Sequence, residues 1–357
     1  MKVHNFSSGP AILPEEVLVE AAQAVIDYKN SGLSILTMSH RNKLFVDIIE
    51  EAQQLVKELL GLSKDHHVLF LSGGASSQFF MIPMNFLASD QFASYSDTGT
   101  WANKAIKEAK NFGEVKVLAS SKEENYAFIP KNIDIPKDSQ YLHLTSNNTI
   151  YGTQYQVFPD TSVPIVCDMS SDIFSREIPT DKFGIIYAGA QKNMGPAGTT
   201  LVVISPEFAE KRANRTIPTM LNYQTHIAEG SMFNTPPTFP IFVSLLTMKW
   251  VKAQGGLKAM EQRNNHKANV LYNEIDRNPL FKGTVAVDDR SKMNVCFVPN
   301  NPDHEKPFFD LCTQNGMIDF KGHRSVGGFR ASIYNAMPLS SIELMVELMQ
   351  EFEKTNG

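Results

Sequence analysis

The sequence predicts an α/β protein in which a large domain, built on a mainly parallel sheet covered by helices, is followed by a smaller α+β domain. Short apolar runs alternate with helical patterns up to about residue 256. That alternation is typical of strands joined by helical crossovers. Beyond it, strands and helices mix without the alternation. We therefore predict an N-terminal segment at 1–15, a large domain at 16–256 and a small domain at 257–357.

Six apolar runs are predicted as strands of the large domain, with helices opening near Ser76 and over 100–113 and 238–256. In sheets of this kind, ligands bind beyond the carboxyl ends of the strands. Residues that directly follow each run are therefore the first candidates for a site. The predicted strands are HHVLFL (66–71), QFASYS (91–96), SQYLHLT (139–145), VPIVCDM (163–169), FGIIYAG (183–189) and TLVVIS (200–205).

The small domain is predicted from a shorter set of patterns. MNVCFVPN (293–300) indicates a strand and KPFFDLCTQNG (306–316) a helix. IDFKGHRSVGGFRASIYN (318–335) indicates a pair of strands, and SSIELMVELMQEFEK (340–354) a final helix.

Composition limits the function classes. The 357 residues are 42% hydrophobic and 20% charged, with a net charge of −5, which is ordinary for a globular protein and indicates neither a nucleic-acid nor an anionic-membrane partner. We find no signal-peptide pattern and no membrane-spanning run, so a cytoplasmic location is expected. The three cysteines, at 167, 296 and 312, have no metal-ligand spacing, and we predict buried thiols and no metal.

Two charged residues follow neighbouring predicted strands. Asp168 ends VPIVC, and Lys192 stands among small residues in AGAQKNMGPAG after the next strand. A buried carboxylate needs a cationic or hydrogen-bonded partner, and a protonated pyridine nitrogen is one. A lysine in a confined pocket has a lowered pKa and forms a Schiff base with a carbonyl.

A third feature is LFLSGGASSQFF, in which glycines follow a strand and hydroxyls open a helix. Backbone amides at a helix start form an anion site. Alone, this motif is equally well a glycine-rich turn with a serine cap. Together, the aspartate, the Schiff-base lysine and the phosphate cradle predict pyridoxal 5′-phosphate (PLP).

The chain resembles the phosphoserine aminotransferases, within the class V group of fold-type I PLP enzymes, over nearly its whole length. The resemblance rests on FSSGPAILP, MSHR, GTWANKA, SNNTIYGTQ, CDMSSDIFSR, AGAQKNMGPAG, NTPPTFPIF and HRSVGGFRASIYNA. It implies a seven-stranded, mainly parallel sheet in the large domain.

The resemblance also implies roles around the cofactor. Lys192 is expected to form the Schiff base and to move the substrate proton, Asp168 to pair with the pyridinium nitrogen, and Trp101 to stack on the ring. Thr149 is expected near the phenolic oxygen or the ring, and Gln191 near the phosphate. Several family members carry an arginine where this chain has Ser76, so a cradle of Ala75 and Ser76 amides and a hydroxyl is expected instead.

A homodimer with sites at the interface is implied, with Asn234 and Thr235 reaching the partner's cofactor phosphate. The implied reaction takes the amino group of glutamate to 3-phosphohydroxypyruvate, in a ping-pong scheme that yields 2-oxoglutarate and O-phosphoserine for serine biosynthesis. A second activity on the 4-phosphohydroxy-threonine pair of vitamin B6 biosynthesis is also implied. Arg330 is expected to bind the α-carboxylate, and the distal carboxylate or phosphate is assigned to His40, Arg41, His323 and Arg324.

Two other functions compete with this one. A cysteine desulfurase of this fold needs a reactive cysteine on a loop, whereas Cys167 and Cys296 lie in predicted strands and Cys312 in a predicted helix. A PLP-binding regulator without turnover needs no substrate cations, and the cations are present. The sequence leaves open which cation binds which substrate end, how the two phosphorylated substrates are shared, and what Ser76 does to cofactor affinity.

Overall fold

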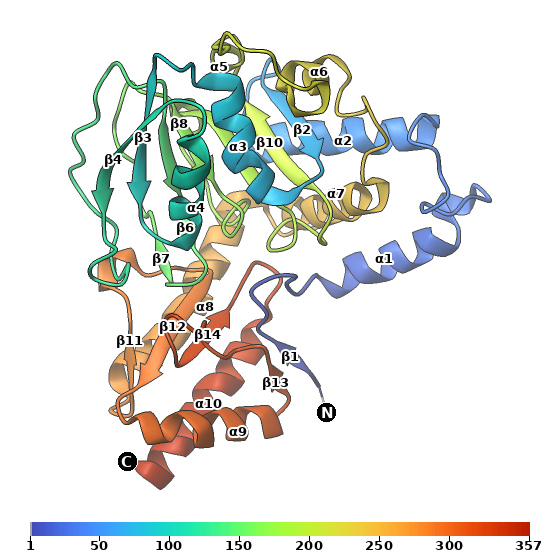
Figure 1. Cartoon of the computed structure of the whole chain (residues 1–357). Coiled ribbons are helices and arrows are strands. Elements are labelled where there is room, and N and C mark those ends of the chain that lie inside the picture. The colour runs from blue at the N-terminus through green and yellow to red at the C-terminus, as the bar shows by residue number, and fades with distance from the viewer. Residues whose placement is uncertain (1) are drawn as a thin grey trace.

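The computed structural model describes residues 2–357. Figure 1 shows a large body built on the main sheet and a smaller one that contains β11, β12, β14, α9 and α10, with α8 running between them. Within the described residues, no helix is long and apolar enough to cross a membrane. The three cysteines are buried and free, as predicted.

The central sheet has seven strands, which confirms the predicted sheet. β10 is antiparallel to both of its neighbours, and the other adjacent pairs are parallel. In spatial order the strands are β2 (His67–Leu71), β10 (Thr200–Ile204), β9 (Phe183–Gly189), β8 (Ile165–Asp168), β5 (Leu142–Thr145), β3 (Phe92–Asp97) and β4 (Glu114–Ser120).

Six of these strands are the predicted apolar runs, and β4 is the strand that the sequence analysis missed. It lies at the edge of the sheet beside β3, and none of its side chains is fully buried. Glu114 and Lys116 interrupt its apolar pattern. An edge strand with solvent on its outer side needs no continuous apolar run, so periodicity gave no signal.

Helices cover both faces of the sheet, and alternate residues of the strands pack against them. Val68 and Phe70 of β2 belong to the core under α1, α2 and α7, whereas Leu69 and Leu71 belong to the core under α3 and α4. The longer helices are α1 (Glu15–Ile26), α2 (Lys43–Leu60), α3 (Gly74–Phe86), α4 (Thr100–Ala109) and α7 (Thr238–Ala253); α5 (Pro206–Ala209) and α6 (Tyr223–Ala228) are short.

The small domain has its own antiparallel sheet, in the order β11 (Phe281–Gly283), β12 (Asn294–Pro299) and β14 (Phe329–Ser332). α8 (Gly256–Arg277), α9 (Glu305–Gln314) and α10 (Leu339–Asn356) pack around it. The polar pair β6 (Asn147–Asn148) and β7 (Thr153–Gln154) forms a separate two-stranded sheet in the large domain.

The predicted strand pair within 318–335 forms only in part: the Arg330 N–H donates to the Phe320 carbonyl and the Gly322 N–H to the Gly328 carbonyl, each at 2.7 Å, but the regular strands of this segment pair elsewhere. β13 (Met317–Ile318) pairs in parallel with β1 (His4–Asn5), while β14 pairs with β12. The N-terminal segment takes the position beside β13, and a single bridge between Lys321 and Phe329 joins the two ends of the loop. Pairing with a segment more than 300 residues away leaves no local sequence signal.

The two cores divide along α8. Leu257 and Met260 near its start pack in the large-domain core, whereas Leu271 and Ile275 pack in the small-domain core, together with Phe6 from the N-terminal segment. The predicted boundary near residue 257 stays a prediction. These contacts support it and attach the N-terminal segment to the small domain.

Candidate active site

A pocket opens where the carboxyl ends of β5, β8 and β9 meet the start of α3. It gathers six of the predicted cofactor residues, from four separate stretches of the chain, as the strand-end rule requires. The residues that line it are Gly74, Ala75, Ser76, Phe79, Trp101, Thr145, Asn147, Asp168, Ser170, Ser171, Gln191 and Lys192.

Asp168 is the last residue of β8, opposite Tyr187 in the parallel neighbour β9. Its side chain is buried, and its Oδ1 accepts a hydrogen bond of 2.9 Å from the Ser170 backbone N–H. Burial raises the pKa of Asp168, against the opposing effects of Ser170 and Lys192. The carboxylate faces the pocket without an ion-pair partner among residues 2–357. A protonated pyridine nitrogen would supply the positive partner that this carboxylate lacks.

Lys192 lies in the turn that follows β9. Its Nζ donates a hydrogen bond of 2.6 Å to Thr149 Oγ1. The pKa of Lys192 is lowered to about 8, mainly by burial; the charge of Asp168 opposes the shift, and the charge of Arg330 adds to it. About a tenth of such an amine is neutral at pH 7, far more than for an ordinary lysine, and this makes it the better nucleophile.

The N-terminal segment packs directly on this lysine. Gly9 has a φ of +142°, and a Cβ there would lie 3.4 Å from Lys192 Cγ. The Ala11 N–H donates a hydrogen bond of 2.9 Å to the Gln191 carbonyl. Residues 9–11 therefore form one wall beside the lysine turn.

The start of α3 forms a cradle with free amides. Gly73 has a φ of +100°, and a Cβ there would lie 2.1 Å from Ser77 Oγ, so only glycine suits the turn. No side chain caps the helix, and Ala75 and Ser76 line the pocket. The first amides of this helix, at the positive end of its dipole, fit a phosphate group.

Two more polar atoms in the pocket are buried without a hydrogen-bond partner in the part of the chain that the structure describes: Trp101 Nε1 and Thr145 Oγ1. One face of the Trp101 ring is covered by Lys104, whose Nζ lies 4.5 Å from the ring centroid. Unsatisfied buried polar atoms around a cavity are expected where a ligand belongs. The donor set, the carboxylate and the ring together fit PLP.

Sequence reasoning missed four polar residues of the pocket, Thr145, Asn147, Ser170 and Ser171. It also missed Ser8, which contacts Arg330 outside the pocket lining. Thr145 ends β5, and Ser170 lies two residues beyond the end of β8. A wider application of the strand-end rule finds the four pocket residues. Ser8 follows no strand of the sheet, and its role emerges only from its contact with Arg330.

Arg330 lies on β14 and reaches toward the pocket from the small domain. Its Nη2 donates a hydrogen bond of 2.8 Å to Ser8 Oγ, and its charge lowers the pKa of both Lys192 and His323. His323 and Arg324 lie in the loop before β14, where His323 Nδ1 is 2.7 Å from Ser325 Oγ and Arg324 is exposed.

The other predicted residues do not reach the pocket of their own chain. His40 and Arg41 lie in the connection between α1 and α2, at the right edge of Figure 1. Asn234 and Thr235 are exposed, and Asn234 lines a neighbouring cavity with Ser72, Gly73 and Ser77. His40 Nε2 is buried without a hydrogen-bond partner among residues 2–357.

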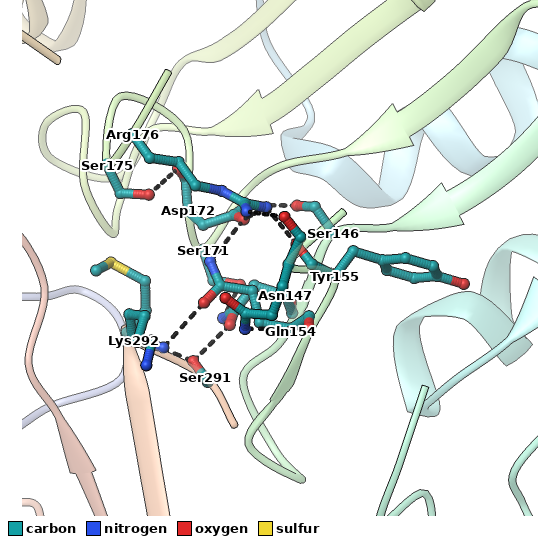
Figure 2. A network of polar contacts seen from close by, with 12 residues as sticks. Ser146, Asn147, Gln154, Tyr155, Ser171, Asp172, Ser175, Arg176, Ser291 and Lys292 are labelled. Atoms are coloured by element: carbon teal, nitrogen blue, oxygen red, sulfur yellow. Dashed lines mark hydrogen bonds and ion pairs between the residues drawn. The ribbon is translucent and has the colours of Figure 1, made fainter. Parts of the chain in front are cut away.

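A buried polar network includes the pocket residues Asn147 and Ser171 (Figure 2). Asp172 accepts hydrogen bonds from the Ser146 hydroxyl and from Gln154 Nε2, the latter at 3.1 Å, and pairs with Arg176 at 3.6 Å. Asn147 Nδ2 donates to Ser171 Oγ and to Asn294 Oδ1, each at 2.8 Å. The network therefore ties the residues after β5 and β8 to β12 of the small domain.

Comparisons with known proteins agree with this chemistry. The family model described as Aminotransferase class-V matches residues 3–345. The chain is 57% identical over 354 residues to the phosphoserine aminotransferase of Flavobacterium johnsoniae. It is 54% identical over 356 residues to that of Bacteroides thetaiotaomicron, and each match covers 99% of both chains.

Solved structures give the same result. A phosphoserine aminotransferase from Bacillus circulans subsp. alkalophilus superposes with a TM-score of 0.96 at 46% identity, over 100% of this chain and 99% of that one. PLP-bound phosphoserine aminotransferase from Trichomonas vaginalis superposes with a TM-score of 0.93 at 37% identity, over 98% and 100%. Fold and pocket define a fold-type I PLP-dependent transferase. The chain belongs to the class V aminotransferase family, and its cofactor is PLP.

Proposed function

We propose that the protein transfers the amino group of glutamate to 3-phosphohydroxypyruvate, giving 2-oxoglutarate and O-phosphoserine, a step of serine biosynthesis. The observation that carries the proposal is the pocket in which Asp168, Lys192 and the α3 cradle meet, with Arg330 beside them. Relatives named phosphoserine aminotransferase that match over the full chain support the choice of substrates.

The cofactor, when bound, supplies an electron sink for the bond being broken at the substrate α-carbon. Lys192 would hold the cofactor covalently, and its amine, when free, would take the proton from the substrate α-carbon and carry it. A pKa of about 8 suits both tasks, because the amine is readily found in either protonation state near neutral pH. The hydrogen bond to Thr149 orients the amine in the free enzyme.

The other predicted cofactor-binding residues are each assigned to one chemical group of PLP. Asp168 keeps the pyridine nitrogen protonated, and Trp101 covers one face of the ring. The amides of Ala75 and Ser76, the Ser76 hydroxyl and the Gln191 amide bind the phosphate. Thr149 would face the phenolic oxygen, and its contact with Lys192 supports that assignment.

Substrate selection rests on cations at both ends. Arg330 binds the α-carboxylate, because its positive charge acts on Lys192 and lowers the pKa of that amine. Its guanidinium also presents a planar pair of N–H donors that suits a carboxylate. His323 and Arg324, with His40 and Arg41, bind the distal carboxylate or phosphate. The Arg330 guanidinium is held by its hydrogen bond to Ser8 Oγ.

A homodimer completes this site. Four predicted site residues lie outside their own chain's pocket: His40, Arg41, Asn234 and Thr235. In a dimer with a two-fold axis, each chain can supply these residues to the pocket of the other chain. Apolar side chains exposed on α1 support a partner-covered face: Leu18 is 51% exposed, Val19 65% and Ile26 75%. Apolar exposure on this scale on one helix is typical of an interface.

The direct test is an absorbance spectrum of the purified holoenzyme during two additions. Glutamate alone is expected to convert the absorption band of the covalently bound cofactor to that of the aminated cofactor. 3-Phosphohydroxypyruvate is then expected to restore it, whereas unphosphorylated hydroxypyruvate restores it far more slowly. Equal recovery with both oxo acids contradicts the proposed substrate, and no change with glutamate contradicts the proposed donor.

A further inference from the structure

Three buried asparagines connect the lysine turn to the strand that carries Arg330. We call Asn193, Asn264 and Asn335 the asparagine joint. Asn193 follows Lys192, Asn264 lies on α8, and Asn335 lies three residues beyond β14. Their side chains are 4%, 2% and 2% exposed, respectively. An amide buried to this degree costs free energy unless it is hydrogen-bonded, so its partners matter.

The joint forms a continuous path across the two domains. The Asn335 backbone N–H donates to Asn193 Oδ1 at 3.0 Å. Asn264 Nδ2 donates to Asn335 Oδ1 at 2.8 Å and also to the Ser175 carbonyl at 3.0 Å. Asn335 Nδ2 donates to the Phe174 carbonyl at 2.8 Å. The end of β14 is thus fixed to the lysine turn, to the loop after Asp168 and to α8 at once.

Lys267 holds the same segment from α8. Its side chain is 1% exposed, and its Nζ donates to the carbonyls of Ile333 at 3.0 Å and Tyr334 at 2.6 Å. It has no carboxylate partner among residues 2–357. Burying an amine against backbone carbonyls alone costs free energy. The two hydrogen bonds fix residues 333–334, which follow Arg330 in the chain.

The N-terminal segment forms a second connection between Lys192 and Arg330. Ser8 Oγ accepts from Arg330 Nη2, and the Ser8 carbonyl accepts a 2.8 Å hydrogen bond from Tyr334 Oη. The adjacent Gly9 packs on Lys192. Two independent sets of contacts therefore constrain where β14 stands relative to the lysine turn.

We propose that the asparagine joint sets the separation between Lys192 and Arg330, and so places the substrate α-carbon within reach of the Lys192 amine. None of the three asparagines lines the pocket, so they are positioning residues. The proposal rests on the proposed function, because it needs Arg330 as the α-carboxylate ligand. Displacements of about 1 Å at a reacting centre cost up to about a hundredfold in rate.

The test compares two buried asparagines of similar bonding. Asn264→Ala removes the two hydrogen bonds that Asn264 donates, to Asn335 Oδ1 and to the Ser175 carbonyl. Asn278→Ala is the control: Asn278 directly follows α8, is 2% exposed, and donates to Glu274 Oε1 at 2.9 Å and to the Met349 carbonyl at 3.2 Å, away from the joint. Thermal unfolding of both variants shows whether their losses of stability match.

Single-turnover amino transfer from glutamate is expected to slow about tenfold in Asn264→Ala and to stay near the parent rate in Asn278→Ala. Cofactor content and its absorption band should be unchanged in both. Crystal structures of the two variants provide a readout besides activity: the distance from Lys192 Nζ to Arg330 Cζ is expected to change only in Asn264→Ala.

Equal slowing in both variants, or an unchanged distance in Asn264→Ala, overturns the proposal. If Asn264→Ala does not fold, Asn335→Ala tests the same contact from the other side. If both fold, their double mutant should slow amino transfer by much less than the product of the single effects, since one hydrogen bond is shared. A parent enzyme inactive with glutamate contradicts the proposed function instead, and the crystallographic distance still decides on the joint.

Discussion

The amine of Lys192 lies 2.6 Å from the hydroxyl of Thr149, although the two residues come from different strand connections. Lys192 is in the turn after β9, and Thr149 follows the short strand β6. Thr149 is itself buried, so its hydroxyl is a fixed acceptor. The amine that we propose takes the substrate proton is therefore oriented by a fixed hydroxyl of its own chain.

Replacing Thr149 by valine keeps the shape of this acceptor and removes its oxygen. We expect amino transfer from glutamate to fall about tenfold or more, because the amine loses its orientation. Thr149→Ser keeps the hydroxyl and should recover most of the rate. Rapid-mixing absorbance measures both, and a Thr149→Val enzyme as fast as Thr149→Ser contradicts the role.

The lowered pKa of Lys192 predicts how the cofactor-free protein captures PLP. Only the neutral amine attacks the aldehyde, so the rate should rise about tenfold per pH unit below pH 8 and level off above it. An ordinary lysine, with a pKa near 10.5, continues to gain rate up to pH 10. Rapid-mixing absorbance between pH 6 and 10 measures the midpoint.

A variant checks the cause of that midpoint. Arg330 contributes to the lowering of the Lys192 pKa, so Arg330→Met is expected to move the midpoint to higher pH. A midpoint that stays in place in Arg330→Met, or a profile without a plateau in the parent, contradicts the electrostatic account.

Asp168→Asn separates the effect of the buried carboxylate on stability from its effect on amino transfer. Without cofactor, burial of Asp168 is unfavourable for the charged form, as its raised pKa indicates. The neutral amide should therefore leave the cofactor-free protein at least as stable as the parent at pH 7. With cofactor, the charge-assisted hydrogen bond is lost, and amino transfer should fall by about ten- to a hundredfold.

Thermal unfolding with and without PLP measures the first effect, and single-turnover rates measure the second. The parent is expected to gain more stability from PLP than Asp168→Asn does. A variant that loses stability without the cofactor, or transfers amino groups at the parent rate, contradicts the assignment of Asp168.

The fold was largely predictable, because buried parallel strands carry continuous apolar runs and their ends mark the site. Asp168, Lys192, Ser76 and Trp101 were found in this way or through the resemblance, and they line one pocket. β4 and the pairing of β1 with β13 were not found, since an exposed edge and a long-range pairing leave no periodic signal.

The supporting contacts of the site lie beyond sequence reasoning for a different reason. Ser8 meets Arg330, and Asn193 meets Asn335, across 322 and 142 residues of chain. Isolated serines and asparagines are common in loops, so their residue type indicates no particular partner. Only the packing of the two domains on α8 brings these groups together.

The cradle allows a gain-of-affinity test. Ser76→Arg adds a guanidinium at the start of α3, where the resemblance places one in several relatives. A charge-assisted hydrogen bond contributes about 1.5–3 kcal/mol, so cofactor release should slow at least about tenfold. Ser76→Gln is the neutral control for side-chain length. Dialysis against phosphate followed by absorbance measures release, and equal retention in both variants contradicts a role for charge at this position.

Mixing two inactive variants tests whether the site is shared between chains. Lys192→Ala lacks the amine, and Arg41→Ala lacks a cation that lies outside its own chain's pocket. If Arg41 serves the partner's site, a dimer with one chain of each kind has one intact site and one with both defects. Random reassociation gives half mixed dimers, so activity should recover to about a quarter of the parent level.

The two variants are unfolded and refolded together, and each is also refolded alone. The glutamate assay then compares the activity of the mixture with that of each variant. If Arg41 acts within its own chain, no mixed dimer has an intact site, and the mixture stays as inactive as its components.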